Sequence, residues 1–187
     1  AHALQHAGAV AVGGVDDDGV DAGLGDGIDD LIVGARAGDD GGTSAGEAYV
    51  IFGRTTSFGT TTVGGNLSAN SNNGDITQAG ALTVAGSSNL QAGTGNISLL
   101  NTGNDFTGAV SALGDVVKIY DKNALTLGTV TTTGDLSVTG SGTLNLGTAN
   151  VGGDLSASSG NGDITQAGAL TVTGTSALRS EEHTSEL

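Results

Sequence analysis

The chain has 187 residues and a net charge of −15 at pH 7, with only five Lys and Arg residues. A nucleic-acid-binding surface needs a basic patch, and an anionic membrane repels so acidic a chain, so neither is an expected partner. The sequence has no cysteine, which excludes disulfides, thiol catalysis and thiolate metal sites. It has no run of about 18 apolar residues, so no membrane-spanning helix is predicted.

The first segment, residues 1–54, is acidic, and nine of the sixteen Asp residues lie between positions 16 and 40. Its phrase GDGIDDLIVGARAGDDGGTSAGEAYVIFG resembles the FG-GAP repeat of integrin α-subunit β-propellers and of many bacterial surface proteins. The resemblance assigns Asp29–Ala35 to the strand after a metal loop and Ala48–Gly53 to the closing strand. Arg36 stands where the family has proline. One such repeat is about one propeller blade, so either more blades precede it or this blade caps the repeats that follow.

The FG-GAP resemblance also implies a calcium loop, Asp-x-Asn/Asp-x-Asp-Gly-x-x-Asp-Leu, whose alternating oxygen ligands suit a hard cation. Asp26–Leu31 fit its second half, but its first two ligand positions fall on Ala22 and Leu24. An insertion would leave Asp16, Asp18 or Asp21 to fill those positions. The implied metal ligands are Asp16, Asp18, Asp26 and Asp30. The alternative is a solvated acidic loop that attracts cations weakly and without a defined site.

After a linker expected at 55–62, residues 63–178 contain a duplicated unit. Val63–Gly86 and Val151–Gly174 match at 20 of 24 positions and start 88 residues apart. The pattern of Gly, then Asp or Asn, then an aliphatic residue recurs with steps of 9, 21, 19, 20, 19 and 9 residues between glycines. Steps near 20 indicate a structural rung. The step of nine is interpreted as an extra half-turn whose place the sequence leaves open.

Within each rung, apolar and polar residues alternate, as in Leu136-Ser-Val138 and Leu144-Asn-Leu146. Period two is the signature of a strand with one buried face, and a short strand pair can bury that face only by stacking on other rungs. The 35 glycines suit tight corners, and the absence of proline preserves the ladders. The pattern therefore predicts an all-β, right-handed parallel β-helix, and the alternating aliphatics argue against a disordered Gly/Ser/Thr/Asn-rich linker.

Three register predictions follow from this stacking. Leu136 should lie directly above or below Leu155, and Ile97 should lie near Val117. Val117 and Ile119 should both face inward. That requires a slip of one residue in the strand pairing relative to Leu136 and Val138, and a slip of one residue moves every side chain of a strand to the opposite face.

The phrases GGNLSANSNNGDITQAGALTV, GNDFTGAVSALG and NALTLGTVTTTGDLSVTG resemble filamentous-haemagglutinin-like exoproteins of bacteria. That family consists of very long secreted or surface-held β-helical chains, often exported by two-partner secretion, and many members are adhesins. The resemblance covers residues 60–178. It implies an extracellular or cell-surface location and a host or neighbouring-cell surface protein or glycan as partner.

The last nine residues, Arg179–Leu187, break the repeat and hold three of the four Glu residues. The string RSEEHTSEL is what AGATCGGAAGAGCACACGTCTGAACTC encodes, which resembles a sequencing-library adapter. We interpret this segment as a disordered or artefactual tail that pairs with nothing. Together with a first residue that is not methionine, it indicates a fragment of a longer protein.

Catalysis finds little support in the sequence. His2 and His6 lie at one end and His183 in the tail, so no His-based triad is predicted. The Asp residues of the repeats follow corner glycines, where turn chemistry explains them, and Lys118 and Lys122 beside Asp121 are typical of a solvated face. The expected function is therefore a non-catalytic, adhesin-like stalk segment of a large bacterial exoprotein. The alternative is a calcium-dependent ligand-binding module of the FG-GAP type with the repeats as spacer.

Overall fold

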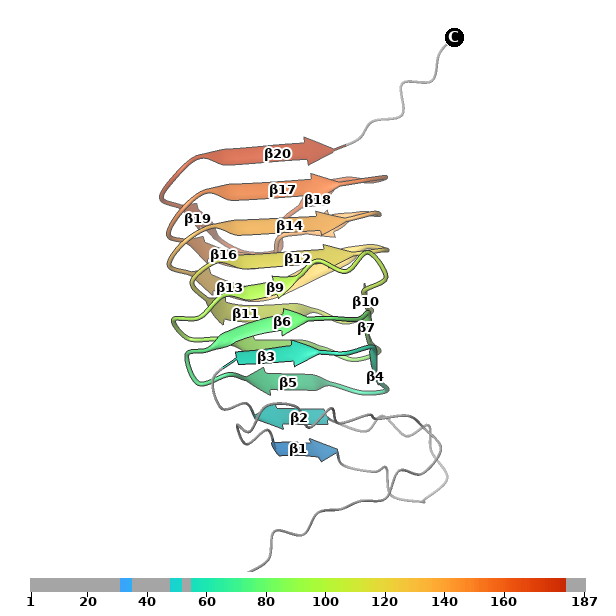
Figure 1. Ribbon diagram of the computed structural model, residues 1–187. Coiled ribbons are helices and arrows are strands. Elements are labelled where there is room, and N and C mark those ends of the chain that lie inside the picture. Colours follow the sequence, from blue (N-terminus) through green and yellow to red (C-terminus); the bar gives the residue numbers. More distant parts are fainter. Residues whose placement is uncertain (1–30, 35–47, 52–54, 181–187) are drawn as a thin grey trace, which may run out of the picture.

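The computed structural model describes residues 31–34, 48–51 and 55–180, and these residues form strands joined by short turns. Figure 1 shows the strands stacked in layers along one axis. Pairing is parallel throughout the described strands, except that β1 (Leu31–Gly34) is antiparallel to β2 (Ala48–Ile51). The chain is thus a parallel β-solenoid of about six turns.

Each turn of the solenoid has three strands, so the shaft has three faces, which we call A, B and C in chain order. Face A contains β2, β5 (Leu67–Asn70), β8 (Ser88–Gln91), β11 (Val110–Gly114), the second half of β13 (Leu125–Thr132), β16 (Thr148–Val151) and β19 (Leu170–Val172). Face B contains β3 (Thr55–Phe58), β6 (Asp75–Gln78), β9 (Ile97–Leu99), β12 (Val117–Asp121), β14 (Leu136–Gly140), β17 (Leu155–Ser159) and β20 (Ser176–Ser180). Face C contains β4 (Thr61–Val63), β7 (Leu82–Val84), β10 (Asp105–Phe106), the first half of β13, β15 (Leu144–Asn145) and β18 (Ile164–Thr165).

All three register predictions are confirmed. Leu136 is the partner of Leu155, and Val117 is the partner of Ile97. Val117 also pairs with Leu136, and Ile119 pairs with Val138, so the predicted slip of one residue is present. Val117 and Ile119 are fully buried. The slip keeps the inner side of the strand apolar. As a result, Val117 and its partner Leu136 lie 19 residues apart, one fewer than the step of 20 between the motif glycines Gly114 and Gly134.

The interior is one continuous apolar column built from the inward residue of each strand. Its members are mainly Leu, Ile, Val and Ala, with Phe58 and Phe106 as the aromatic members. Residues that face inward in one turn lie against those of the next turn at the strand spacing of about 4.8 Å. No single turn has enough apolar surface to fold alone, so the stacking itself creates the core.

The two copies of the duplicated unit lie on different faces. In the first copy the strands run β5, β6 and β7, on faces A, B and C. In the second copy the matching strands are β17, β18 and β19, on faces B, C and A. The offset of 88 residues is therefore four turns plus one face. The step of nine is one face rather than half a turn, and each rung holds three strands rather than two.

The segment boundaries differ from the expectation at both ends. Residues 55–62, expected to be a linker, contain β3 and the start of β4, which pair in parallel with β6 and β7. β2, assigned by the FG-GAP resemblance to the closing strand of a blade, pairs in parallel with β5 and begins face A. Strand stacking thus starts before Val63, and no propeller blade is formed by the residues that the structure describes.

The expectation that nothing from Arg179 onward would pair with the core is wrong for two residues. Arg179 and Ser180 complete β20, in register with Ser158 and Ser159 of β17. Backbone groups form this ladder whatever the side chains are, so a change of sequence does not stop pairing at once. The remaining tail residues, 181–187, lie outside the described residues.

Candidate functional site

The polar side chains that could carry chemistry lie mainly at the corners, directly before a strand. At the corner between faces A and B, the carboxylates and amides accept hydrogen bonds from the backbone of the next turn. Asp75 Oδ1 accepts from Asn96 N–H at 2.7 Å, and Asn96 Oδ1 accepts from Val116 N–H at 3.1 Å. Further along, Asp135 Oδ1 accepts from Asp154 N–H at 2.8 Å. We call this row the corner ladder.

The corner ladder continues in the second copy of the repeat. Asp154 Oδ1 accepts from Thr175 N–H at 2.7 Å, although Asp154 is exposed. The backbone N–H and the side chain of Thr175 hold the pKa of Asp154 below its ordinary value. A carboxylate held as an acceptor in this way stabilises the turn and is poorly placed to take up a proton near neutral pH.

The same contacts form in both copies despite the change of face. Asn66 Oδ1 accepts from Ser87 N–H at 2.9 Å at the corner that leads into face A. Its counterpart Asp154 does the same for Thr175 at the corner that leads into face B. Likewise Ser71 Oγ donates to Gly74 O, and Ser159 Oγ donates to Gly162 O. The corner chemistry therefore belongs to the local sequence and not to a particular face.

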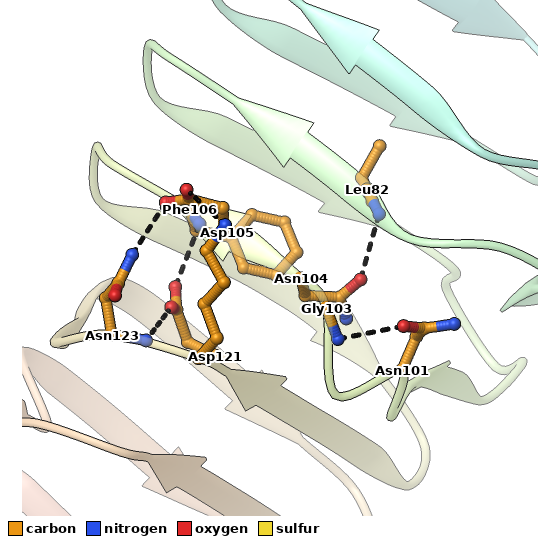
Figure 2. A network of polar contacts seen from close by, with 9 residues as sticks. Leu82, Asn101, Gly103, Asn104, Asp105, Phe106, Asp121 and Asn123 are labelled. Atoms are coloured by element: carbon orange, nitrogen blue, oxygen red, sulfur yellow. Dashed lines mark hydrogen bonds and ion pairs between the residues drawn. The ribbon is translucent and has the colours of Figure 1, made fainter.

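A second polar cluster lies inside the corner between faces B and C (Figure 2). Asn104 is fully buried, and its Oδ1 accepts from Leu82 N–H at 3.0 Å and from the Gln78 amide at 2.8 Å. Its own amide donates to Gln78 Oε1 at 2.8 Å and to Leu99 O at 3.1 Å. One amide thus ties together parts of the chain separated by up to 26 residues.

Asp121 lies in the next turn of this corner and is also fully buried. Its two carboxylate oxygens accept from Phe106 N–H at 2.9 Å and from Asn123 N–H at 2.7 Å, as Figure 2 shows. Burial raises the pKa of Asp121 above its ordinary value, while the hydrogen bonds from Asn123 and Phe106 act in the opposite direction. The nearby Asp105 adds to the increase and Lys122 opposes it.

The interpretation of Lys118, Asp121 and Lys122 as a solvated face is therefore wrong for Asp121. Lys122 Nζ lies 2.9 Å from Asp105 Oδ2 at the surface, and Lys118 is exposed on the outer side of face B. The alternation in VKIYD places Asp121 in phase with the inward Val117 and Ile119. That phase was the signal from which its burial could have been predicted.

The proposed calcium ligands Asp16, Asp18, Asp26 and Asp30 lie outside the described residues. Among the residues that the structure does describe, no three His, Asp or Glu side chains gather closely enough to hold a metal ion. Likewise, none of these described residues forms a helix of the length and hydropathy that would cross a bilayer. In that part of the chain several of these side chains, among them Asp75, Asp135 and Asp154, join one turn to the next.

The stacked turns and their corner ladder define a repeat protein of the parallel β-solenoid class. Residues 46–113, 114–145 and 139–185 match the family described as repeats of unknown function (DUF5649), and the chain belongs to that family. The matched range includes β2 and reaches into the tail. No curated protein and no solved structure matches the chain.

Proposed function

We propose that this chain is a non-catalytic segment of a large bacterial exoprotein, secreted or displayed on the cell surface, where it acts as an adhesin-like stalk. The observation that carries the proposal is that one sequence unit folds on two different faces with the same corner contacts. Such a shaft can be lengthened by thirds of a turn without a new fold. Length is the property that a stalk requires.

The surface of the shaft agrees with a structural role. Outward positions on face B include Ser98, Lys118, Ser137 and Ser156, which lie side by side in successive turns. The four positions that differ between the two copies of the repeat are all exposed in the first copy, namely Asn66, Asn70, Asn72 and Ala85. Outward side chains are thus free to vary, and this is where contacts with a host or neighbouring-cell protein or glycan would form.

The resemblance to filamentous-haemagglutinin-like exoproteins, including their right-handed winding and export, is part of this proposal. So is the FG-GAP resemblance of the first 54 residues, which supplies a second candidate function. In that candidate the acidic segment is a calcium-dependent ligand-binding module and the solenoid is its spacer. The Asp-rich phrase around Asp26–Leu31 is the feature that favours it.

The stalk proposal is tested with the full chain in two parallel assays: binding to host cells or extracellular matrix, and turnover of polysaccharides. The matched variant is Asp135→Asn, because Asn96 already serves as an acceptor in the same corner ladder. We expect adhesion that is equal in the two proteins, and no turnover in either. Robust turnover that is lost in Asp135→Asn or Asp121→Asn would identify an enzyme and overturn the proposal.

The calcium candidate is tested by titration calorimetry of the full chain. A true site should give one saturable binding event that is weakened by Asp26→Ala and by Asp30→Ala. Asp163→Ala is the control, since it removes one carboxylate of the repeats and leaves the acidic segment intact. A heat signal that is the same in all four proteins would leave only diffuse counter-ion attraction.

A further inference from the structure

The sequence contains two Asn-Gly pairs, and the duplication places them at equivalent positions. Asn73–Gly74 lies in the turn before β6, and Asn161–Gly162 lies in the turn before β18. Both Asn side chains are exposed. From the glycine onward, the next eleven residues, GDITQAGALTV, are the same in both copies. Any difference in reactivity between the two pairs must therefore come mainly from the fold.

The fold holds the two glycine nitrogens differently. Gly74 N–H donates to Ser71 O at 3.0 Å, which fixes the nitrogen within its turn. Gly162 N–H has no acceptor among the described residues, although the neighbouring bond from Ser159 Oγ to Gly162 O is retained. Both Asn side chains are themselves hydrogen-bonded, since Asn73 Oδ1 accepts from Thr94 N–H at 3.2 Å and Asn161 Nδ2 donates to Ser141 O at 3.4 Å, so the difference between the copies lies at the glycine nitrogen.

We propose that Asn161 is a site of spontaneous deamidation and that the fold protects Asn73 from the same reaction. The Gly162 backbone nitrogen attacks Cγ of the Asn161 side chain and forms a five-membered succinimide. The proton of that nitrogen passes to the side-chain amide nitrogen, which leaves as ammonia. Water then opens the ring at either carbonyl and gives aspartate or isoaspartate. Glycine favours the attack because it has no Cβ to obstruct the approach.

The product changes the corner between β17 and β18. Asn161 Nδ2 donates to Ser141 O of the preceding turn at 3.4 Å. A carboxylate in its place brings an acceptor oxygen next to Ser141 O, which is also an acceptor, so the hydrogen bond is lost. Isoaspartate also lengthens the backbone by one methylene. Both changes weaken the contact between these two turns, and they add a negative charge close to Asp163.

The test follows deamidation of the purified full chain during incubation in mildly alkaline buffer. Peptide mapping by mass spectrometry measures the conversion at Asn73 and Asn161 in the same sample, and isoaspartyl methylation identifies the product. The same incubation in concentrated urea gives the rates without the fold. Asn161→Gln serves as the control, because the longer side chain cannot form the five-membered ring at this turn and Asn73 is left unchanged.

We expect Asn161 to react faster than Asn73 in the folded chain by roughly fivefold, the ratio that one net hydrogen bond provides. In urea the two rates should become similar. Equal rates in the folded chain, or faster loss at Asn73, would overturn the proposal. So would two folded-state sites that stay intact while both react in urea, or a lack of reaction at Asn161 under both conditions.

Discussion

Leu146 belongs to the apolar column, and its side chain is 2% exposed just after β15. Leu146→Asp would place a charge among aliphatic side chains with no partner to receive it. We expect a loss of at least about 3 kcal/mol in the free energy of unfolding, measured by urea denaturation. Thr126→Asp is the control, because Thr126 is exposed on the same face. If the two variants lost equal stability, Leu146 would not lie inside the shaft.

Asp121 is a buried residue whose charge state depends on the fold. Its pKa is raised above the ordinary value of 3.8, chiefly by burial, so the folded chain binds this proton more tightly than the unfolded chain does. The stabilising contribution is therefore complete below 3.8 and is lost as the pH rises through the raised pKa. We predict that this part of the pH dependence disappears in Asp121→Asn.

The measurement for Asp121 is urea denaturation of both proteins at a series of pH values from strongly acidic to neutral. Because an amide does not ionise, Asp121→Asn should not show the loss of stability that the parent shows as the pH rises through the raised pKa of Asp121. The informative quantity is the difference in slope against pH. Parallel curves would show that Asp121 keeps its ordinary pKa in the folded chain.

At the scale of the strand and its corner, the glycine of the repeated motif is needed for space. A Cβ added at Gly95 would collide with the backbone of Gly74 in the turn below, whereas one added at Gly64 would meet nothing within 4 Å. Gly95→Ala should therefore cost about 1–3 kcal/mol, and Gly64→Ala should be neutral or slightly stabilising. Thermal unfolding of the two variants provides a direct comparison, and equal melting temperatures would contradict this account.

The sequence pattern correctly placed glycines at the corners, but it gave only part of the reason why glycine is needed there. Glycine suits a tight corner in part because it tolerates positive φ, yet among the described glycines only Gly93 and Gly147 have a positive φ. The motif glycines are required because the next turn passes close to them, and that proximity involves residues about 20 positions away. A local pattern gives the position of a corner, but it does not report what lies above or below it.

The register was predictable because it depends on period and spacing alone. Leu136 and Leu155 lie 19 residues apart in identical local patterns, and they pair directly. The contact of Gln78 with Asn104 was not predicted, because amides near strand ends look like surface residues until the phase of each strand is known. The burial of Asp121 was predictable, since it is in phase with Val117 and Ile119. The number of strands per turn was also not predictable, since the motif marks some corners and omits others.

For the whole molecule, the change of face between the copies shows that the three faces are interchangeable for at least one sequence unit. The inward residues of Val63–Gly86 and Val151–Gly174 are the same. The same set of side chains therefore fills the core whether the first full strand of the unit lies on face A or on face B. A duplication of any multiple of a third of a turn then keeps the ladders continuous. Growth of the shaft by duplication is less restricted than whole-turn repeats would require.

This equivalence predicts the outcome of a further duplication. A second copy of residues 65–152, inserted between Gly152 and Gly153, should add four turns and one face. At a spacing of about 4.8 Å, the shaft should become roughly 21 Å longer, and the part that follows the insertion should be turned by one face. Small-angle scattering and electron microscopy measure the length, and circular dichroism measures the strand content.

The control for this insertion is a Gly/Ser block of the same length, which should add a flexible loop and little strand signal. The inserted repeat should raise the strand content in proportion to its length, since each new corner finds the acceptors that Asn66 and Asp154 already provide on two faces. If the repeat insertion behaved like the Gly/Ser block, the faces would not be interchangeable. The position of the second copy would then depend on its neighbours rather than on its own sequence.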